Sequence, residues 1–304
     1  MVNIASLGKP ETASKIGKKG TVSDITMYNY KGREGDITFM HPHRYPERVP
    51  PLLYSVNLAH GALITVENMD KTLGEEMVAL DLRGIEQGIF ILKNYIMPEQ
   101  IKPLIKGTSL ENYAFMDDPI EIREKLATYE MPGLSDRTLI PIDHFFPVKG
   151  VGTVVLGTVL GGEASVHQEL QMYPYERMVQ VRSIQVHDRD RKEAGIGSRV
   201  GLALKNTDVN ELERGITLAE PGSMTVGRKF TIKPTLSPYW KGEIKKDMIL
   251  HLSSGTQFVP GRMLDGDTIE LDRKMAFSPG EKILMAHLES MPRVVGVTEL
   301  ELIE

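Results

Sequence analysis

The chain has 304 residues, of which 41% are hydrophobic and 25% are charged. Its formal net charge of −5 at pH 7 argues against a surface that binds nucleic acid generally, so any RNA contact must be local. It contains no cysteine, so disulfide frameworks, cysteine-ligated zinc and a thiol nucleophile are excluded. No apolar run reaches transmembrane length and the first residues do not resemble a secretory signal, so we expect a cytoplasmic protein.

The first apolar segment, Val2 to Gly8, predicts a strand that runs into a glycine, and residues 11–19 predict a helix after it. Strand, glycine turn and helix is the layout that places a phosphate at a helix N-terminus. A phosphate loop of the form G-x-x-x-x-G-K-[ST] needs glycine, lysine and a hydroxyl residue where this sequence has Ala13, Ser14 and Lys15. We therefore expect Gly8, Ala13, Ser14 and Lys15 to be a remnant loop that no longer holds nucleotide.

Residues 21–30 and 36–40 predict a hairpin around the loop at residues 31–35. His41 and His43 follow it, and residues two apart at a strand end lie on one face, where both can bind a metal ion. No cysteine or third carboxylate nearby completes the ligand set, so we predict no metal, and a surface loop or an interface is the alternative.

Helices and strands then alternate along the next part of the chain. The patterns predict helices at residues 50–57, 72–82, 98–106 and 120–129, and strands at residues 60–67, 88–95 and 109–115. Such alternation predicts an α/β layer with a mostly parallel sheet. Asp117 and Asp118 precede the last helix, where we interpret them as helix caps rather than as catalytic residues.

From Phe146 onward, short runs of Val, Thr and Leu alternate with glycines, at residues 146–162, 181–187 and 194–204. This pattern predicts strands of a small barrel whose bends need backbone without a Cβ. Further strand-like runs predict a second small barrel, at residues 229–236, 247–252, 256–264, 268–271, 282–288 and 293–302. Within it, Tyr239 and Trp240 would either stack on a nucleic-acid base or pack at the barrel edge.

The run I-D-H-F-F-P-V-K-G-V-G-T-V-V-L-G at residues 142–157 resembles the second domain of translational GTPases. The resemblance is to the elongation factor Tu and selenocysteine-specific elongation factor family, as an archaeal-type paralogue. It implies a trimmed P-loop-type G domain at residues 1–135, followed by β-barrels at residues 136–222 and 223–304, an α/β plus all-β fold.

The family's other nucleotide motifs are also degenerate in this chain. Residues 40–44 stand where the family has D-x-P-G-H and retain only the proline, and residues 93–96 stand near the guanine-reading N-K-x-D and lack its aspartate. The interval from Gly8 to Met40 leaves no room for the long first switch loop of an elongation factor. All three nucleotide motifs are therefore expected to be inactive.

In this family the second domain helps to hold the aminoacyl end of tRNA, so the resemblance implies an RNA contact here. The candidates are His144, Arg182, His187 and Arg199, each expected at or near a strand end. In the alternative interpretation, Arg182 and Arg199 pair with acidic residues on the barrel surface. The alternating charges of residues 187–192 predict a solvated loop.

We therefore predict an elongation-factor-like protein of translation that has lost GTP binding and hydrolysis, with no catalytic residues and no cofactor. It would bind tRNA, another RNA or a ribosome-associated component, away from any membrane, as a monomer or with a protein partner. Two alternatives remain open. One is a functional GTPase that holds GTP and Mg²⁺ with atypical loops, although each lost charged hydrogen bond weakens nucleotide binding. The other is a protein-interaction scaffold without nucleic acid.

Overall fold

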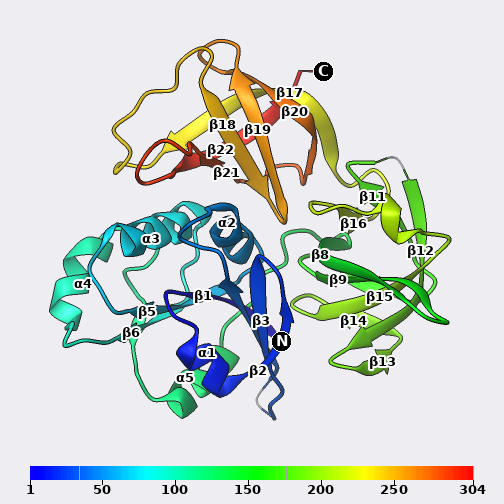
Figure 1. Ribbon diagram of the computed structural model, residues 1–304, viewed down its shortest axis with the longest axis horizontal. Coiled ribbons are helices and arrows are strands. Elements are labelled where there is room, and N and C mark those ends of the chain that lie inside the picture. The colour runs from blue at the N-terminus through cyan, green and yellow to red at the C-terminus, as the bar shows by residue number, and fades with distance from the viewer. Residues whose placement is uncertain (34, 176, 304) are drawn as a thin grey trace. The chain divides into compact units, whose positions relative to one another are not determined.

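The computed structural model describes residues 1–33, 35–175 and 177–303 (Figure 1). The chain divides into two compact units. Unit 1 comprises Met1–Met131, Pro234–Ile244 and Lys282–Thr298, and unit 2 comprises Pro132–Lys233, Lys245–Glu281 and Glu299–Glu304. None of the described helices has the length and apolarity needed to cross a bilayer.

A seven-stranded mixed sheet, ordered β2-β3-β4-β1-β5-β6-β7, forms the centre of the N-terminal part of the chain. Its strands are β1 (Val2–Leu7), β2 (Lys18–Val22), β3 (Ile25–Tyr30), β4 (Ile37–Pro42), β5 (Gly61–Val66), β6 (Gly88–Leu92) and β7 (Ala114–Phe115). The pairings β4–β1–β5–β6–β7 are parallel, and β2–β3–β4 are antiparallel. The prediction of a mostly parallel sheet is confirmed.

Helices cover both faces of this sheet (Figure 1). They are α1 (Glu11–Ile16), α2 (Pro50–Asn57), α3 (Lys71–Arg83), α4 (Pro98–Ile105) and α5 (Pro119–Ala127). Helices α1 and α5 bury Ala13, Ile122 and Leu126 in one hydrophobic core with strand residues such as Ile4 and Phe39. Helices α2 and α3 lie over the opposite face (Figure 1).

The last of these helices has the cap expected from the sequence. The Asp118 side chain accepts hydrogen bonds from the backbone N–H groups of Ile120 and Glu121, at 2.9 and 3.0 Å. The capping interpretation is therefore confirmed for Asp118, whose carboxylate satisfies two N–H groups that have no partner within the helix.

Several predicted element boundaries were wrong. The first helix ends at Ile16 rather than at Lys19, because residues 18–22 form β2 and pair with β3 at the sheet edge. The strand expected at residues 88–95 ends at Leu92, because Asn94 and Tyr95 adopt left-handed backbone angles. The strand expected at residues 109–115 is only Ala114–Phe115. In the loop at residues 31–35, Glu34 lies outside the described residues.

The first barrel is formed by β8 (Leu139–Val148), β9 (Gly152–Thr158), β11 (Glu169–Tyr173), β12 (Arg177–Val186), β15 (Arg199–Lys205) and β16 (Thr217–Ala219). They follow the order β11-β16-β8-β9-β15-β12, and pairing of β11 with β12 closes the sheet. The short β13 (Arg189–Arg191) adds to the end of β12, and β10 (Glu163–Ser165) pairs with β14 (Glu193–Gly195). A 3₁₀ turn spans Val209–Glu211.

The second barrel is closed in the order β17-β20-β19-β18-β21-β22. Its strands are β17 (Thr225–Leu236), β18 (Ile249–Ser254), β19 (Gln257–Met263), β20 (Thr268–Phe277), β21 (Ile283–Ala286) and β22 (Val294–Leu302). Each of the six strand-like runs predicted in this region contributes a strand. The fold class predicted from the sequence, an α/β sheet domain followed by two small barrels, is confirmed.

Candidate functional site: the remnant phosphate loop and the first barrel

A cavity of about 360 Å³ opens at the carboxyl ends of β1 and β5. This is the edge of a parallel sheet where α/β proteins place their ligands. The loops after the two strands line it, through Gly8, Lys9 and Glu67 among others, together with His41 from the end of β4 and Glu76 from α3. The remnant phosphate loop therefore begins at the cavity expected for a ligand.

Gly8 is required by the backbone at this point. Its φ of +69° is left-handed, and a Cβ built on it would lie 2.1 Å from the carbonyl oxygen of Thr65. Glycine is the residue that adopts this conformation without steric cost. The neighbouring strand thus approaches the loop so closely that no side chain fits here.

The backbone N–H of Gly8 donates a hydrogen bond of 2.9 Å to Oε1 of Glu76. Glu76 is 2% exposed. Burial raises the pKa of this carboxyl to about 8, an effect opposed by the Gly8 hydrogen bond and assisted by the nearby charges of Asp70 and Glu75. In a phosphate loop the Gly8 N–H would face a phosphate, whereas here it is hydrogen-bonded to Glu76 of the same chain.

The other predicted loop positions lie away from this cavity. Ala13 is buried in the core beneath α1. The Ser14 hydroxyl donates to the carbonyl of Glu11 at 2.8 Å, and Lys15 is exposed to solvent. Of the four predicted remnant positions, only Gly8 lines the cavity.

Lys9 is the only cation among the described residues that line this cavity. Its Nζ lies 2.7 Å from a carboxylate oxygen of Glu67, and this hydrogen-bonded pair raises the pKa of Lys9. Glu67 and Asp70 line the same space, as does Glu76, whose raised pKa of about 8 keeps it mostly protonated at neutral pH. The acidic groups outnumber the basic one, so this cavity has the charge opposite to that which a nucleotide's phosphates require.

The two histidines do not act as a pair. His41 Nδ1 lies 3.0 Å from the carbonyl oxygen of Ser6, to which it donates, and burial lowers the pKa of His41. His43 is exposed and does not line the cavity. Among the described residues no group of three His, Cys, Asp or Glu side chains is placed to hold a metal ion.

The loop that would read guanine has a different role. The side-chain amide of Asn94 donates to the backbone carbonyl of Glu67 at 3.0 Å. Tyr95, which follows it, is fully exposed. Asn94 thus joins the loops after β5 and β6, and the sequence has no aspartate at residues 93–96 to accept hydrogen bonds from guanine.

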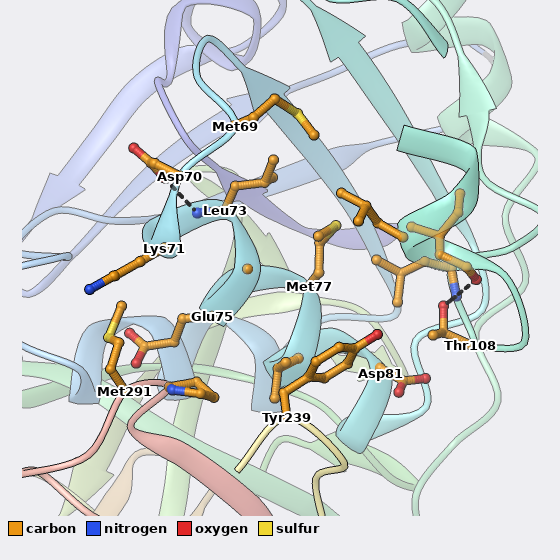
Figure 2. Close-up of a pocket in the computed structure, with 16 residues that line it drawn as sticks. Met69, Asp70, Lys71, Leu73, Glu75, Met77, Asp81, Thr108, Tyr239 and Met291 are labelled. Carbon is orange, nitrogen blue, oxygen red and sulfur yellow. Dashed lines mark hydrogen bonds between the residues drawn. The ribbon is translucent and has the colours of Figure 1, made fainter. Parts of the chain in front are cut away.

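A second cavity of unit 1, of about 540 Å³, has a different chemistry. In Figure 2 the side chains of Leu73 and Met77 project from α3 into it, and Tyr239 and Met291 line it from other segments of the unit. Its lining is mainly apolar and rich in methionine, which suits an apolar side chain rather than a phosphate. Trp240 is buried and does not line this cavity, whereas Tyr239 is exposed.

Glu75, at the edge of this second cavity, has its own partner. Its carboxylate accepts two hydrogen bonds from Arg293 Nε, and the Arg293 Nη2 donates to Oε2 at 2.6 Å. The guanidinium also lies over the Tyr45 ring, 5.7 Å from the centroid. Glu75 is fully buried, so this ion pair is a structural contact and not a free binding group.

In the first barrel, the structure brings two of the predicted RNA-contact residues together around Asp143. Arg199 donates two hydrogen bonds to the Asp143 carboxylate, the longer of 2.7 Å, and His144 Nδ1 donates to Oδ1 at 2.6 Å. A β-bulge between Ile142 and His144 turns Asp143 into the interior. Burial alone would raise the pKa of Asp143, but Arg199 and His144 hold it below its ordinary value.

The other two candidates lie elsewhere on the same barrel. Arg182 is exposed and donates to the carbonyl of Val151 at 2.9 Å. His187 occupies the turn after β12 with a left-handed φ of 52°. Arg199 is only 9% exposed, so its guanidinium is engaged in the buried ion pair with Asp143. The buried Nε2 of His144 has no hydrogen-bond partner among the described residues.

Two important residues were missed by sequence reasoning. Asp143 carried a signal, since it is a lone acid in an apolar strand and buried acids need partners. Glu76 carried none, because Glu75 and Glu76 stand together on a helix whose acidic residues resemble a solvated face. Only the position of α3 against the Gly8 loop distinguishes them.

Known proteins resemble this chain over part or all of its length. The family described as elongation factor Tu domain 2 matches residues 152–219. The selenocysteine-specific elongation factor of Methanocaldococcus jannaschii is 26% identical over 352 aligned positions, covering 99% of this chain and 75% of that protein. An uncharacterised protein of the same organism is 36% identical, covering 98% of this chain and 99% of that protein. This chain belongs to the elongation factor Tu and selenocysteine-specific elongation factor family.

The same family accounts for the architecture. Translation elongation factor SelB from Methanococcus maripaludis, solved in complex with the GTP analogue GppNHp, matches with a TM-score of 0.83 and 23% identity, over 98% of this chain and 78% of that chain. The alignment with the M. jannaschii elongation factor spans 352 positions, whereas the present chain has 304 residues. That elongation factor therefore has residues that the present chain lacks. The family and the three-part fold expected from the sequence are confirmed.

Proposed function

We propose that this chain is an elongation-factor-like RNA-binding protein that works without bound GTP. The observation that carries the proposal is the hydrogen bond from the Gly8 N–H to the buried Glu76 carboxyl. A protein acid at the start of the remnant loop competes directly with a phosphate, and an ionised one would repel it. The nearby lysine is already paired with Glu67.

The sequence supports the same proposal independently. Ala13, Ser14 and Lys15 do not supply the glycine, lysine and hydroxyl of a phosphate loop at the required positions. Residues 93–96 offer no carboxylate for guanine. Since hydrogen bonds to charged groups are the strong ones, losing several together leaves little affinity for GTP and Mg²⁺.

Calorimetric and thermal-shift titration of GTP and GDP with Mg²⁺ tests this part of the proposal. A micromolar site exposed to about 1 mM nucleotide would stabilise the folded protein by about 4 kcal/mol, a shift of several degrees. We expect no saturable heat and no shift. A nucleotide-specific shift of several degrees, absent with Mg²⁺ alone, would establish the chain as a GTP-binding factor with atypical loops.

For the RNA part, support comes from the barrel that matches elongation factor Tu domain 2. His144 is oriented by Asp143 through Nδ1, and its side chain remains 14% exposed. Arg182 is an exposed cation on the same barrel. We propose these two side chains as contacts for RNA, including the aminoacyl end of a tRNA, with Arg199 holding Asp143 in place.

Filter binding of labelled tRNA at about 50 mM salt tests this contact, because phosphate contacts are strongest at low salt. We expect retention of the wild-type protein and weaker retention of His144→Gln and of Arg182→Glu. Lys246→Glu, an exposed lysine of the same unit, is the control for a change of net charge. No retention of the wild type would end the RNA proposal.

A protein-binding scaffold is the second candidate, favoured by the apolar cavity of Figure 2. Met69, Leu104, Tyr239 and Met291 line it and are 43% to 54% exposed. Exposed apolar side chains around a cavity are typical of protein contact sites. Leu104→Asp should then abolish capture of a specific protein partner from cell extract, while tRNA retention is unchanged.

A further inference from the structure

The β12–β13 hairpin holds its strands in a fixed register. His187 and Asp188 have φ values of 52° and 62°, and two left-handed residues in a two-residue connection form a type I′ turn. Val186 pairs with Arg189, and Ile184 pairs with Arg191. The turn and the ladder together fix where the side chains of β13 point.

This register sorts the charges of β13 by face. Alternate residues of a strand point to opposite faces, so Arg189 and Arg191 share one face and Asp190 lies on the other. Asp190 accepts a hydrogen bond of 2.9 Å from Gln185 Nε2, its partner across the ladder. The alternating signs that predict a solvated loop in the sequence are therefore separated in the structure. Lys192 follows at the end of the strand.

These cations are uncompensated. Arg189, Arg191 and Lys192 are exposed, and across the part of the chain that the structure describes none of the three side chains makes an ion pair or a hydrogen bond. The hairpin backbone is nevertheless tied down, since the carbonyl of Lys192 accepts from the N–H of Val166 at 2.9 Å.

Several other arginines of the same unit lie beside acidic partners. Arg177 lies 2.5 Å from Glu211, and Arg273 lies 3.6 Å from Glu213. In a chain with a net charge of −5, this strand face thus carries two arginines without an acidic partner among the described residues. Moreover β13 is the outermost strand of its sheet, so the hairpin is open on one side.

We propose that this arginine face of the β12–β13 hairpin, Arg189 and Arg191 with Lys192 beside them, binds the phosphate backbone of RNA. The inference rests on the RNA-binding function proposed above and places a contact that the sequence did not identify. Two arginines on one strand face lie about 7 Å apart, a separation comparable with that of neighbouring phosphates along one strand. Guanidinium groups bind phosphate oxygens through paired hydrogen bonds.

Such a contact is independent of base sequence and sensitive to salt. Three phosphate contacts predict a plot of log affinity against log salt with a slope of about −2 to −3. Each cation removed lowers that slope by about one. A contact through neutral groups would show neither property.

The test measures binding of fluorescent tRNA and of a fluorescent 20-nucleotide oligouridylate by anisotropy, between about 50 and 200 mM salt. The variant is Arg189→Glu/Arg191→Glu. Its control, Lys246→Glu/Lys102→Glu, changes the net charge equally at exposed lysines elsewhere. We expect the hairpin variant to bind at least about tenfold more weakly, with a slope smaller by about two, and the control to stay close to wild type.

A conservative variant separates charge from folding. Arg189→Lys/Arg191→Lys should keep the salt slope and lose only the paired geometry, and thermal unfolding should show all variants folded. If the wild type binds no RNA, the proposed function itself fails. Wild-type binding that the Arg→Glu pair leaves unchanged, or that the control weakens equally, would overturn the hairpin assignment alone. Heparin bound as tightly through the same arginines would overturn RNA as the partner.

Discussion

At the scale of single residues, the Gly8–Glu76 contact joins the first glycine of the phosphate-loop layout to a buried acid of α3. The backbone still bends as a loop that faces an anion, since Gly8 keeps a left-handed φ that excludes a side chain. A buried carboxyl now satisfies its amide. The loop is thus held by a contact within the protein, which is consistent with the proposed absence of bound nucleotide.

The raised pKa of Glu76 predicts a pH-dependent stability. Its pKa of about 8 in the folded protein is above the ordinary 4.5, so between these values the folded state retains a proton that the unfolded state releases. Stability from this group is therefore complete at low pH and falls as pH rises, by up to about 1.4 kcal/mol per pH unit.

Glu76→Gln removes this titration, because glutamine stays neutral. Urea unfolding of both proteins at pH 5, 6, 7 and 8 should show the stability of the variant rising relative to wild type as the pH increases. Parallel pH profiles would mean that Glu76 is ionised in the folded protein.

Gly8 predicts a second residue-scale effect. Gly8→Ala places a Cβ 2.1 Å from a backbone carbonyl, whereas Gly84 has a similar φ of +75° with nothing within 4 Å of a Cβ. Gly84→Ala should cost about 1–2 kcal/mol for backbone strain alone. Gly8→Ala should cost clearly more in chemical denaturation, and equal losses would contradict the close packing of β5 against the loop.

At the scale of elements, the bulge in β8 turns Asp143 into a buried cluster with Arg199 and His144. Removing one member of a buried ion pair leaves the other charge unpaired, at about 3–5 kcal/mol. The arrangement therefore fixes β8 against β15 and orients the imidazole of His144.

Asp143→Asn should accordingly destabilise unit 2 by about 3–5 kcal/mol, while Asp143→Leu/Arg199→Met should lose less than the single variant. Urea unfolding of the single and double variants measures the difference. Because the pKa of Asp143 is lowered in the folded state, its contribution is present at neutral pH and lost as pH falls below the ordinary carboxyl range. A double variant worse than the single would rule out a compensating pair.

At the scale of the whole molecule, the proposal is an elongation-factor fold without a nucleotide switch. In a switch protein, one ligand commonly changes the affinity of another by about 5- to 150-fold. If no nucleotide binds, no such coupling exists. The affinity for tRNA should then be the same with GTP, with GDP and with neither, all in the presence of Mg²⁺.

Anisotropy titrations under these three conditions measure the coupling directly. An affinity that depends on the nucleotide would restore the switch, whatever the cavity at Gly8 contains. The same titrations with Glu76→Gln, which stays neutral at every pH, ask whether removing the acid's titration is enough to regain nucleotide. We expect that it is not, because Ser14 and Lys15 lie outside the cavity.

The sequence by itself determined the fold class, because hydrophobic periodicity and glycine-punctuated β-branched runs are local signals, and the resemblance of residues 142–157 indicated the family. It also predicts that the nucleotide motifs are degenerate, since residue identity at a fixed spacing needs no coordinates. It failed at element boundaries such as residues 18–22, where pairing at a sheet edge outweighs helix propensity.

Only the tertiary structure decided which group contacts the Gly8 amide and which arginines are exposed without an ion pair. Glu76 lies 68 positions from Gly8 in sequence, and Arg199 lies 56 from Asp143, so no local pattern reports either contact. Conversely, the alternating charges of residues 189–191 resemble a solvated loop of mixed charge until strand pairing places the two arginines on one face. Burial and side-chain direction are properties of packed elements. They distinguish Arg199, which is buried in an ion pair, from the exposed Arg189 and Arg191.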